Sequence, residues 1–154
     1  MKRYLLDTNI LMLYVRNDSR YKYIDSTYNP PISGESTSVI SVVTEGELKA
    51  IALKRQWGFN KMQVVKSTLR DFLKADINVN EIIERYAEID AYCEGELASK
   101  PLSTSSRKMG KNDLWIAATA SVLGLTLLTT DKDFDHLKDV YFDLAYVDLN
   151  TIPK

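Results

Sequence analysis

The sequence predicts an α/β fold with a parallel sheet, and two patterns carry that prediction. Short apolar or β-branched runs alternate with amphipathic helical patterns along the 154 residues, as in strand–helix–strand units. Three predicted strands also lead directly into acidic segments. Asp7 follows the first strand, a helix carrying Glu45 and Glu47 follows the second, and Asp131 follows the strand at 125–129. Ligands of open parallel sheets collect at the carboxyl ends of the strands, so the second pattern predicts the location of a site.

The bulk properties predict one soluble domain covering residues 1–154. A hydrophobic content of 45% and a charged content of 27% are ordinary for a globular protein. No apolar run approaches the roughly 18–20 residues that cross a bilayer, and Asp7 follows the start too closely for a signal peptide. The single cysteine, Cys93, excludes an internal disulfide. These features fit a protein of the reducing cytoplasm.

The first half of the chain predicts two strands, each followed by a helix. Thr8 or Asn9 is the expected N-cap of the first helix, and Thr44 with Glu47 has capping-box spacing at the second. In order, the expected elements are a strand at 3–6, a helix at 8–16, a polar segment at 17–36 that holds a short helix at 19–28 and the pair Pro30-Pro31, a strand at 38–42 and a helix at 44–55.

The second half continues the alternation. Cys93 falls on the apolar stripe of a helix and is expected in the core, whereas His136 lies outside every motif and is expected at the surface. In order, the expected elements are a helix at 60–74, a strand at 77–79, a helix at 81–98, a surface loop at 101–110, a helix at 112–123 ended by Gly124, a strand at 125–129, a turn into a short helix at 130–134 and a strand at 142–147.

Charge is segregated along the chain although the net charge is only −1. Residues 49–74 carry seven Lys or Arg against Asp71, residues 76–99 carry seven Asp or Glu against Arg85, and residues 100–111 are basic again. Such segregation creates local positive surfaces on a neutral protein. The plainer interpretation, solvated helix faces, stays open for each segment.

The acidic residues at the expected strand ends predict a metal site. Asp113 joins Asp7, Glu45, Glu47 and Asp131, because it lies in the first turn of a helix whose start faces the same sheet edge. Two carboxylates about 4 Å apart repel by roughly 4 kcal/mol, so such a cluster needs a cation. Oxygen ligands without His or Cys favour Mg²⁺ or Mn²⁺, which points to metal-dependent hydrolysis of a phosphodiester. Each acid alone also reads as a helix cap or dipole partner.

Four motifs in this order resemble those of the PIN-domain ribonucleases, and within them the VapC-type toxins of type II toxin–antitoxin pairs. The motifs are Leu5-Leu6-Asp7-Thr8-Asn9, Ser41-Val42-Val43-Thr44-Glu45-Gly46-Glu47-Leu48, Gly110-Lys111-Asn112-Asp113-Leu114-Trp115-Ile116-Ala117-Ala118 and Leu128-Thr129-Thr130-Asp131-Lys132-Asp133-Phe134. The resemblance implies a PIN-like, Rossmann-like three-layer fold, in which helices flank a central, mainly parallel sheet.

The resemblance also implies residue roles. The catalytic and metal-binding carboxylates would be Asp7, Glu47, Asp113 and Asp131, where Glu47 is preferred to its neighbour Glu45 because the family's acid directly precedes a leucine. Asn9, Thr129 and Thr130 resemble residues that orient carboxylates or water, and Asp133 would cap its turn while Phe134 packs into the core. The basic residues expected to contact RNA phosphates are Arg107, Lys108 and Lys111.

The implied protein is a cytoplasmic, homodimeric Mg²⁺- or Mn²⁺-dependent endoribonuclease, with RNA as substrate, a cognate antitoxin as partner and no membrane association. Residues 17–36 match no family feature, so partner specificity is the open point. Two alternatives remain at this stage. One is a phosphatase of the haloacid-dehalogenase type with Asp7 as nucleophile, although Asn9 stands where such enzymes carry a second Asp. The other is a non-catalytic RNA- or protein-binding module on the same scaffold.

Overall fold

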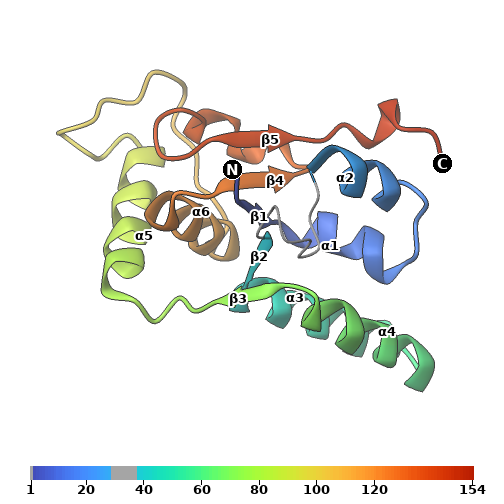
Figure 1. Ribbon diagram of the computed structural model, residues 1–154. Helices are drawn as coiled ribbons and strands as arrows, with labels where there is room; N and C mark the ends of the chain where they lie inside the picture. Colours follow the sequence, from blue (N-terminus) through green and yellow to red (C-terminus); the bar gives the residue numbers. More distant parts are fainter. Residues whose placement is uncertain (1, 29–37) are drawn as a thin grey trace.

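The computed structural model describes residues 2–28 and 38–154, which form one five-stranded sheet covered by helices (Figure 1). All strand pairs are parallel, and the strand order is β3-β2-β1-β4-β5. The parallel α/β fold predicted from the sequence is therefore confirmed. The strands are β1 (Tyr4–Leu6), β2 (Ser38–Ser41), β3 (Leu73–Ala75), β4 (Thr126–Thr129) and β5 (Leu144–Tyr146).

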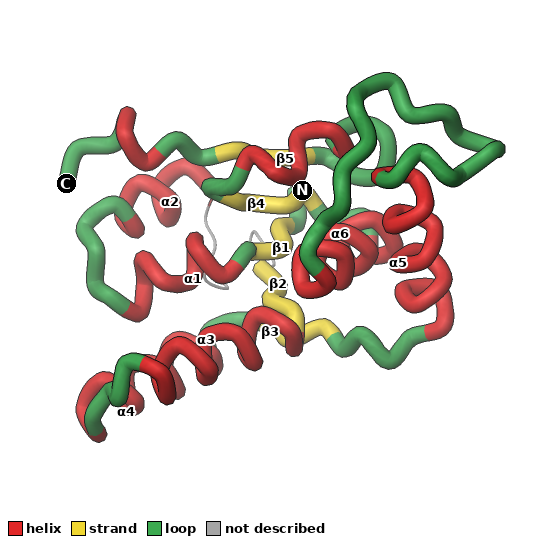
Figure 2. Tube along the Cα trace, turned by 180° about the vertical axis from the view of Figure 1, so that it is seen from behind, coloured by secondary structure: helices red, strands yellow, loops and turns green. Residues whose placement is uncertain are grey.

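Helices pack on both faces of the sheet, so the molecule has three layers. In Figure 1, α5 and α6 lie on one side of the strands and α1, α2 and α4 on the other, as the reverse view in Figure 2 also shows. The described helices are α1 (Thr8–Val15), α2 (Tyr21–Tyr28), α3 (Val42–Lys54), α4 (Phe59–Arg70), α5 (Asn80–Cys93) and α6 (Lys111–Leu123), with 3₁₀ turns η1 (Lys132–Leu137) and η2 (Leu149–Thr151).

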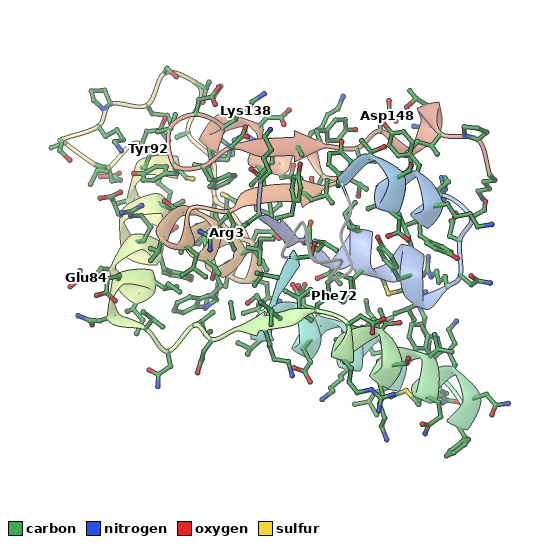
Figure 3. All side chains as sticks on the ribbon, in the orientation of Figure 1. Arg3, Phe72, Glu84, Tyr92, Lys138 and Asp148 are labelled. Atoms are coloured by element: carbon green, nitrogen blue, oxygen red, sulfur yellow. The ribbon has the colours of Figure 1, made fainter. Side chains whose placement is uncertain are left out.

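The central strand β1 divides the core into two hydrophobic clusters. Leu5 packs with residues of α5 and α6, whereas Tyr4 and Leu6 pack with residues of α1 and α4. Tyr92 belongs to the first cluster and Phe72 to the second, and Figure 3 shows these two side chains on α5 and next to β3. Burial on both faces explains why β1 reads as a continuous apolar run.

Two helix caps differ from the predicted ones, and the junction between β2 and α3 is one residue shorter than the sequence predicted. Only Asp7 separates β1 from α1, and it is the N-cap, since its carboxylate accepts a hydrogen bond from the Thr8 amide. No residue separates β2 from α3, whose N-cap is Ser41. The predicted caps at Thr8 or Asn9 and at Thr44 were therefore wrong. Helical geometry begins at the strand end itself, which moves each cap toward the N-terminus.

The third strand was also misplaced. The sequence predicted residues 77–79, but β3 covers Leu73–Ala75 and α4 ends at Arg70 rather than at 74. β3 is an edge strand whose Leu73 and Lys74 are exposed, so it lacks the burial pattern that marks a strand. Phe72 and Leu73 also extend the apolar spacing of the preceding helix. Similarly, α5 ends at Cys93 rather than 98, and Gly95 follows with a φ of 74°.

The burial of Cys93 and His136 and the structure of the 17–36 segment were also predicted from the sequence. Cys93 is fully buried, as predicted. His136 is half-buried rather than on the surface, with its Nε2 3.0 Å from the Cys93 sulfur. The helix expected at 19–28 is α2, while the Pro30-Pro31 part of the 17–36 segment lies outside the described residues. No helix in the described ranges is long and apolar enough to cross a membrane.

Candidate functional site

Four predicted carboxylates come from elements that meet at the carboxyl edge of the sheet. Asp7 follows β1 and Asp131 follows β4, and these strands are neighbours, with Leu6 opposite Leu128. The Asp7 amide continues this pairing by donating to the Leu128 carbonyl at 3.0 Å. Glu47 lies in the second turn of α3, which follows β2 on the other side of β1. Asp113 lies in the first turn of α6.

Asp7 is the most firmly held of the four. Its residue surface is 6% exposed, and both carboxylate oxygens accept hydrogen bonds. The Thr8 amide donates to Oδ1 at 2.8 Å, and the Thr129 hydroxyl donates to Oδ2 at 2.8 Å. The same hydroxyl accepts from the Asp131 amide at 3.0 Å. Thr129 therefore connects the acid after β1 to the acid after β4 through one buried oxygen.

Glu47 and Glu45 face different surroundings although they are two residues apart on α3. The Thr8 hydroxyl donates to Glu47 Oε1 at 2.8 Å, which ties Glu47 to the start of α1. Glu45 instead forms ion pairs with Lys49, at 2.7 Å, and with Lys74 of β3. Hydrogen bonds from these two lysines lower the pKa of Glu45. Residues i and i+2 of a helix do not share a face, so only one of the two acids can join Asp7.

The carboxylates repel one another. Burial raises the pKa of Asp113 to about 6, and the charges of Asp7, Asp131, Glu47 and Asp133 add to that increase. Burial is also the largest reason why the pKa of Asp7 is raised, against the opposing effect of its Thr129 and Thr8 hydrogen bonds. None of the ion pairs within residues 2–28 and 38–154 involves the predicted acids, which are Asp7, Glu47, Asp113 and Asp131. The cluster is a concentration of uncompensated negative charge.

Asp131 takes the capping role that the sequence assigned to Asp133. Asp131 caps η1, because its Oδ1 accepts from the Asp133 amide at 2.9 Å. Asp133 was predicted to cap this turn, but it lies with Asp113 along a polar pocket. Phe134 is fully buried, as predicted. The sequence did not predict the hydrogen bond from Thr8 to Glu47 or the position of Asp133 beside Asp113. Each involves a residue of another helix, so no local pattern indicates it.

Three hollows surround the acids, and each carries basic side chains. One, of about 310 Å³, contains Asp113, Asp133, Arg107 and Lys108. A second, of about 230 Å³, contains Asn9 and Thr130 together with the side chains Arg16, Arg20 and Arg55. The third, of about 520 Å³, lies between α3 and α6 and contains Glu47, Lys54, Asn112 and Trp115. The structure thus places Arg107 and Lys108 beside Asp113, while Lys111 is exposed on the first residue of α6.

The donor chemistry of the cluster fits a hard divalent cation. All four acids offer carboxylate oxygens, the ligands that Mg²⁺ and Mn²⁺ prefer, and their mutual repulsion is what such a cation relieves. In the described ranges, however, no group of three or more Asp, Glu, His or Cys side chains is arranged so that it could hold a metal ion. The residues therefore fit a metal by chemistry and charge, without forming a complete set of ligands in this arrangement.

Replacing Thr129 by Val is expected to reduce the free energy of unfolding by about 1–3 kcal/mol, because it leaves Asp7 Oδ2 and the Asp131 amide without their shared partner. Valine keeps the shape of the threonine side chain and its preference for strands, so the loss of stability measures the contribution of the hydroxyl. Urea denaturation measures the change. Thr126→Val, on the same strand, is the matched control, since the Thr126 hydroxyl makes only one long contact of 3.4 Å. Equal losses in both variants would contradict the assigned role.

The contribution of Asp113 to the stability of the metal-free protein is expected to fall as pH rises from about 4 to about 6.5. Asp113 has a folded pKa of about 6 against an ordinary value of 3.8, so in this window the folded state binds more protons than the unfolded state. The full shift corresponds to about 3 kcal/mol, and solvent screening at a half-buried carboxylate reduces that to about 1 kcal/mol.

This pH effect is measured as the difference between the wild type and Asp113→Asn, each unfolded by urea in EDTA at pH 4.5 and pH 7.5. The difference cancels the contributions of other acids, such as Asp18, whose pKa its Arg20 partner lowers to about 2. The variant is expected to be relatively more stable at the higher pH. A difference that does not change with pH would contradict the electrostatic account of Asp113.

Comparisons with known proteins extend this description. A family model described as "PIN domain" matches residues 4–140. A search of curated proteins found no match to the sequence.

Several solved structures share the fold over nearly the whole chain. VapBC2 from Rickettsia felis, bound to a DNA fragment from its promoter, gives a TM-score of 0.76 at 20% identity, covering 95% of this chain and 99% of that one. VapBC-1 from nontypeable Haemophilus influenzae gives 0.64 at 21%, covering 94% and 97%. VapBC-5 from Mycobacterium tuberculosis, of the VapBC family of toxin–antitoxin systems, gives 0.61 at 21%, covering 96% and 100%. At such identities the likeness shows the fold.

Proposed function

Since this chain belongs to the PIN domain family, we propose that it is a metal-dependent nuclease that hydrolyses phosphodiester bonds of RNA. The observation that carries the proposal is the uncompensated carboxylate cluster at one sheet edge. Asp7 is held there by two hydrogen bonds, and the charges of Asp7, Asp131, Glu47 and Asp133 help to raise the pKa of Asp113. A structural role does not explain why a fold would keep this repulsion, whereas a cation relieves it.

The residues that would hold Mg²⁺ or Mn²⁺ are Asp7, Glu47, Asp113 and Asp131. Bound there, the ion supplies Lewis acidity toward a phosphoryl oxygen and lowers the pKa of a coordinated water. The protein's contribution is orientation. Thr8 holds both Asp7 and Glu47, and Thr129 holds Asp7 and positions the Asp131 backbone. We assign Asn9 and Thr130, which line the adjoining hollow, to substrate or water positioning.

Basic side chains on several sides of the cluster support a polyanionic substrate. Arg107 and Lys108 lie beside Asp113, Lys54 lies in the hollow that contains Glu47, and Arg16 and Arg55 lie in the hollow that contains Asn9. A protein with a net charge of −1 can therefore bind a phosphate backbone locally. We include Lys111 in this set because it is exposed at the start of the same helix as Asp113. The choice of RNA rests on the family resemblance.

We further propose that the chain acts as the toxin of a toxin–antitoxin pair, as one domain over residues 1–154, homodimeric and cytoplasmic. The support is the whole-chain likeness to structures of VapBC complexes. A cognate antitoxin would be its protein partner. Co-expression with the product of an adjacent small reading frame tests this proposal. A stable complex that relieves growth inhibition is the expected result, and a lack of growth inhibition on expression alone would contradict it.

The test of the chemistry is a cleavage assay with single-stranded RNA. We expect cleavage in Mg²⁺ or Mn²⁺, none in EDTA, and recovery when either ion is restored. Single-stranded DNA of the same sequence controls for substrate class, and an Asp7→Asn preparation purified in parallel controls for contaminating ribonuclease. Cleavage that persists in EDTA or in the control preparation would contradict the proposal, and measured absence of Mg²⁺ and Mn²⁺ binding would favour a non-catalytic module.

A further inference from the structure

The hollow between α3 and α6, called the Trp115 cleft below, has features that the proposed hydrolysis does not use. Its volume is about 520 Å³, within the range of about 300–1,000 Å³ typical of small-ligand sites. Its walls include Val43, Glu47, Lys54, Ile77, Asn112 and Trp115. We propose that this cleft receives an unpaired nucleobase of the substrate RNA beside the scissile phosphate, an inference that rests on the proposed nuclease function.

The cleft is continuous with the acidic cluster at two points. Glu47 lines the cleft and also accepts the hydrogen bond from Thr8 that ties it to Asp7. Asn112 lines the cleft and directly precedes Asp113 on α6. A group seated in the cleft therefore lies next to one proposed metal ligand, Glu47, and against the residue that precedes another, Asp113. For a substrate whose phosphate is at the carboxylates, the nearest group that can fill this cleft is an adjoining base.

The composition of the walls suits a flat heteroaromatic ring with a polar edge. Trp115 provides an indole for stacking, and Val43 and Ile77 provide apolar surface. The Asn112 amide offers one acceptor and two donor hydrogens, which can pair with the edge of a base. Lys54 is exposed at the same cleft, and none of the ion pairs in the described ranges involves it, so its charge is available to a neighbouring phosphate.

The opposite wall leaves room for such a ring. Gly46 and Ala50 lie four residues apart on α3 and both line the cleft. A Cβ placed on Gly46 would meet nothing within 4 Å, so the space in front of it is open. Larger side chains there would take up part of the cleft volume.

The indole is supported from outside the cleft. The Tyr86 ring on α5 packs against it with centroids 4.3 Å apart and an interplanar angle of 37°. Val43, Ile77 and Tyr86 pack, like Trp115, against the hydrophobic cluster between the sheet and α5 and α6. Because the indole is already held in place, it loses little conformational entropy when a base stacks on it, and this favours binding of an unpaired base. A base-paired duplex would present no free face to it.

Trp115 also makes the proposal measurable, because the chain has only two tryptophans. In a Trp57→Phe background, tryptophan fluorescence reports Trp115 alone. We expect saturable quenching by six-nucleotide single-stranded RNAs in EDTA, where no cleavage occurs, and no quenching by ribose 5-phosphate. Absence of quenching by every oligonucleotide would overturn the proposal, as would equal quenching by ribose 5-phosphate. Quenching by a co-expressed protein partner alone would mean that a peptide occupies the cleft and would also overturn it.

Kinetics provide the second readout. Trp115→Leu is expected to raise KM for RNA about 5- to 100-fold with a smaller change in kcat, and Trp115→Phe is expected to restore most of the loss. Asn112→Asp is expected to change the preferred base beside the cleavage position. If RNA is cleaved but Trp115→Leu leaves KM and base preference unchanged, the subsite is wrong while the nuclease stands. If no RNA is cleaved, the quenching experiment still decides whether the cleft binds a base.

Discussion

Asp7→Asn is expected to reduce RNA cleavage about a thousandfold or more while the protein stays folded. Asp7 is the proposed ligand that the fold orients most completely, with one hydrogen bond to each oxygen. The substitution keeps the size of the side chain and its acceptor oxygen for the Thr8 amide, but it removes the negative charge that a cation requires. The Thr129 hydroxyl can turn to accept from the introduced amide group.

The folded state of this variant should be as stable as the wild type in EDTA, or more stable by about 1 kcal/mol. Burial already disfavours the Asp7 charge, as its raised pKa indicates, so neutralising it removes a cost. Circular dichroism and urea denaturation test the fold, and added Mg²⁺ should raise the melting temperature of the wild type only. Metal-dependent cleavage at a near-wild-type rate would remove Asp7 from the mechanism. A phosphate trapped covalently on Asp7 would favour the phosphatase alternative.

The second large effect is a contrast between Glu47→Gln and Glu45→Gln. The two variants carry the same chemical change on the same helix. Glu47→Gln is expected to lower cleavage about 100-fold or more, because Glu47 is the α3 acid that shares Thr8 with Asp7. Glu45→Gln is expected to leave cleavage within about twofold and to cost less than about 1 kcal/mol of stability, since it removes only the ion pairs to Lys49 and Lys74.

Initial cleavage rates at saturating Mg²⁺, with unfolding measured in parallel, separate the two outcomes. The variants serve as controls for each other, because general damage to α3 would appear in both. If Glu45→Gln abolishes cleavage and Glu47→Gln does not, the proposed ligand set is wrong at this position. If both lose activity together with stability, the helix and not a ligand has been tested.

The fold was predictable where the local sequence pattern of a segment reflects its burial in the folded protein. The run Tyr4-Leu5-Leu6 is apolar because β1 is central and buried on both faces, so the strand and its position follow from one signal. β3 gave no such signal. Its pairing with β2 is made by backbone groups, and its exposed side chains are unconstrained by a core. Helix spacing continued into it, and the prediction followed the spacing.

The positions of the candidate acids in the fold were more predictable than the contacts of their side chains. The strand-end positions of Asp7 and Asp131 are visible in the sequence, since parallel strands end at one edge. The separation of Glu47 from Glu45 is a matter of which helix face meets Thr8 and which meets Lys74, and no local pattern encodes it. The same holds for Asp133, which lines the pocket beside Asp113 while Asp131 caps the turn.

Only one residue, Asp7, joins β1 to α1, and this short connection limits where the chain can tolerate insertions. One added residue between Leu6 and Thr8 would rotate α1 by about 100° relative to the strand. Ile10, Leu11 and the other buried residues of α1 would then leave the core at the same time as the acid left the sheet edge. The same residue spacing therefore positions both the core residues of α1 and the acid of the site. We therefore expect length changes to be better tolerated at exposed positions of the loop between α5 and α6, such as Ser103 and Thr104, which belong to neither hydrophobic cluster.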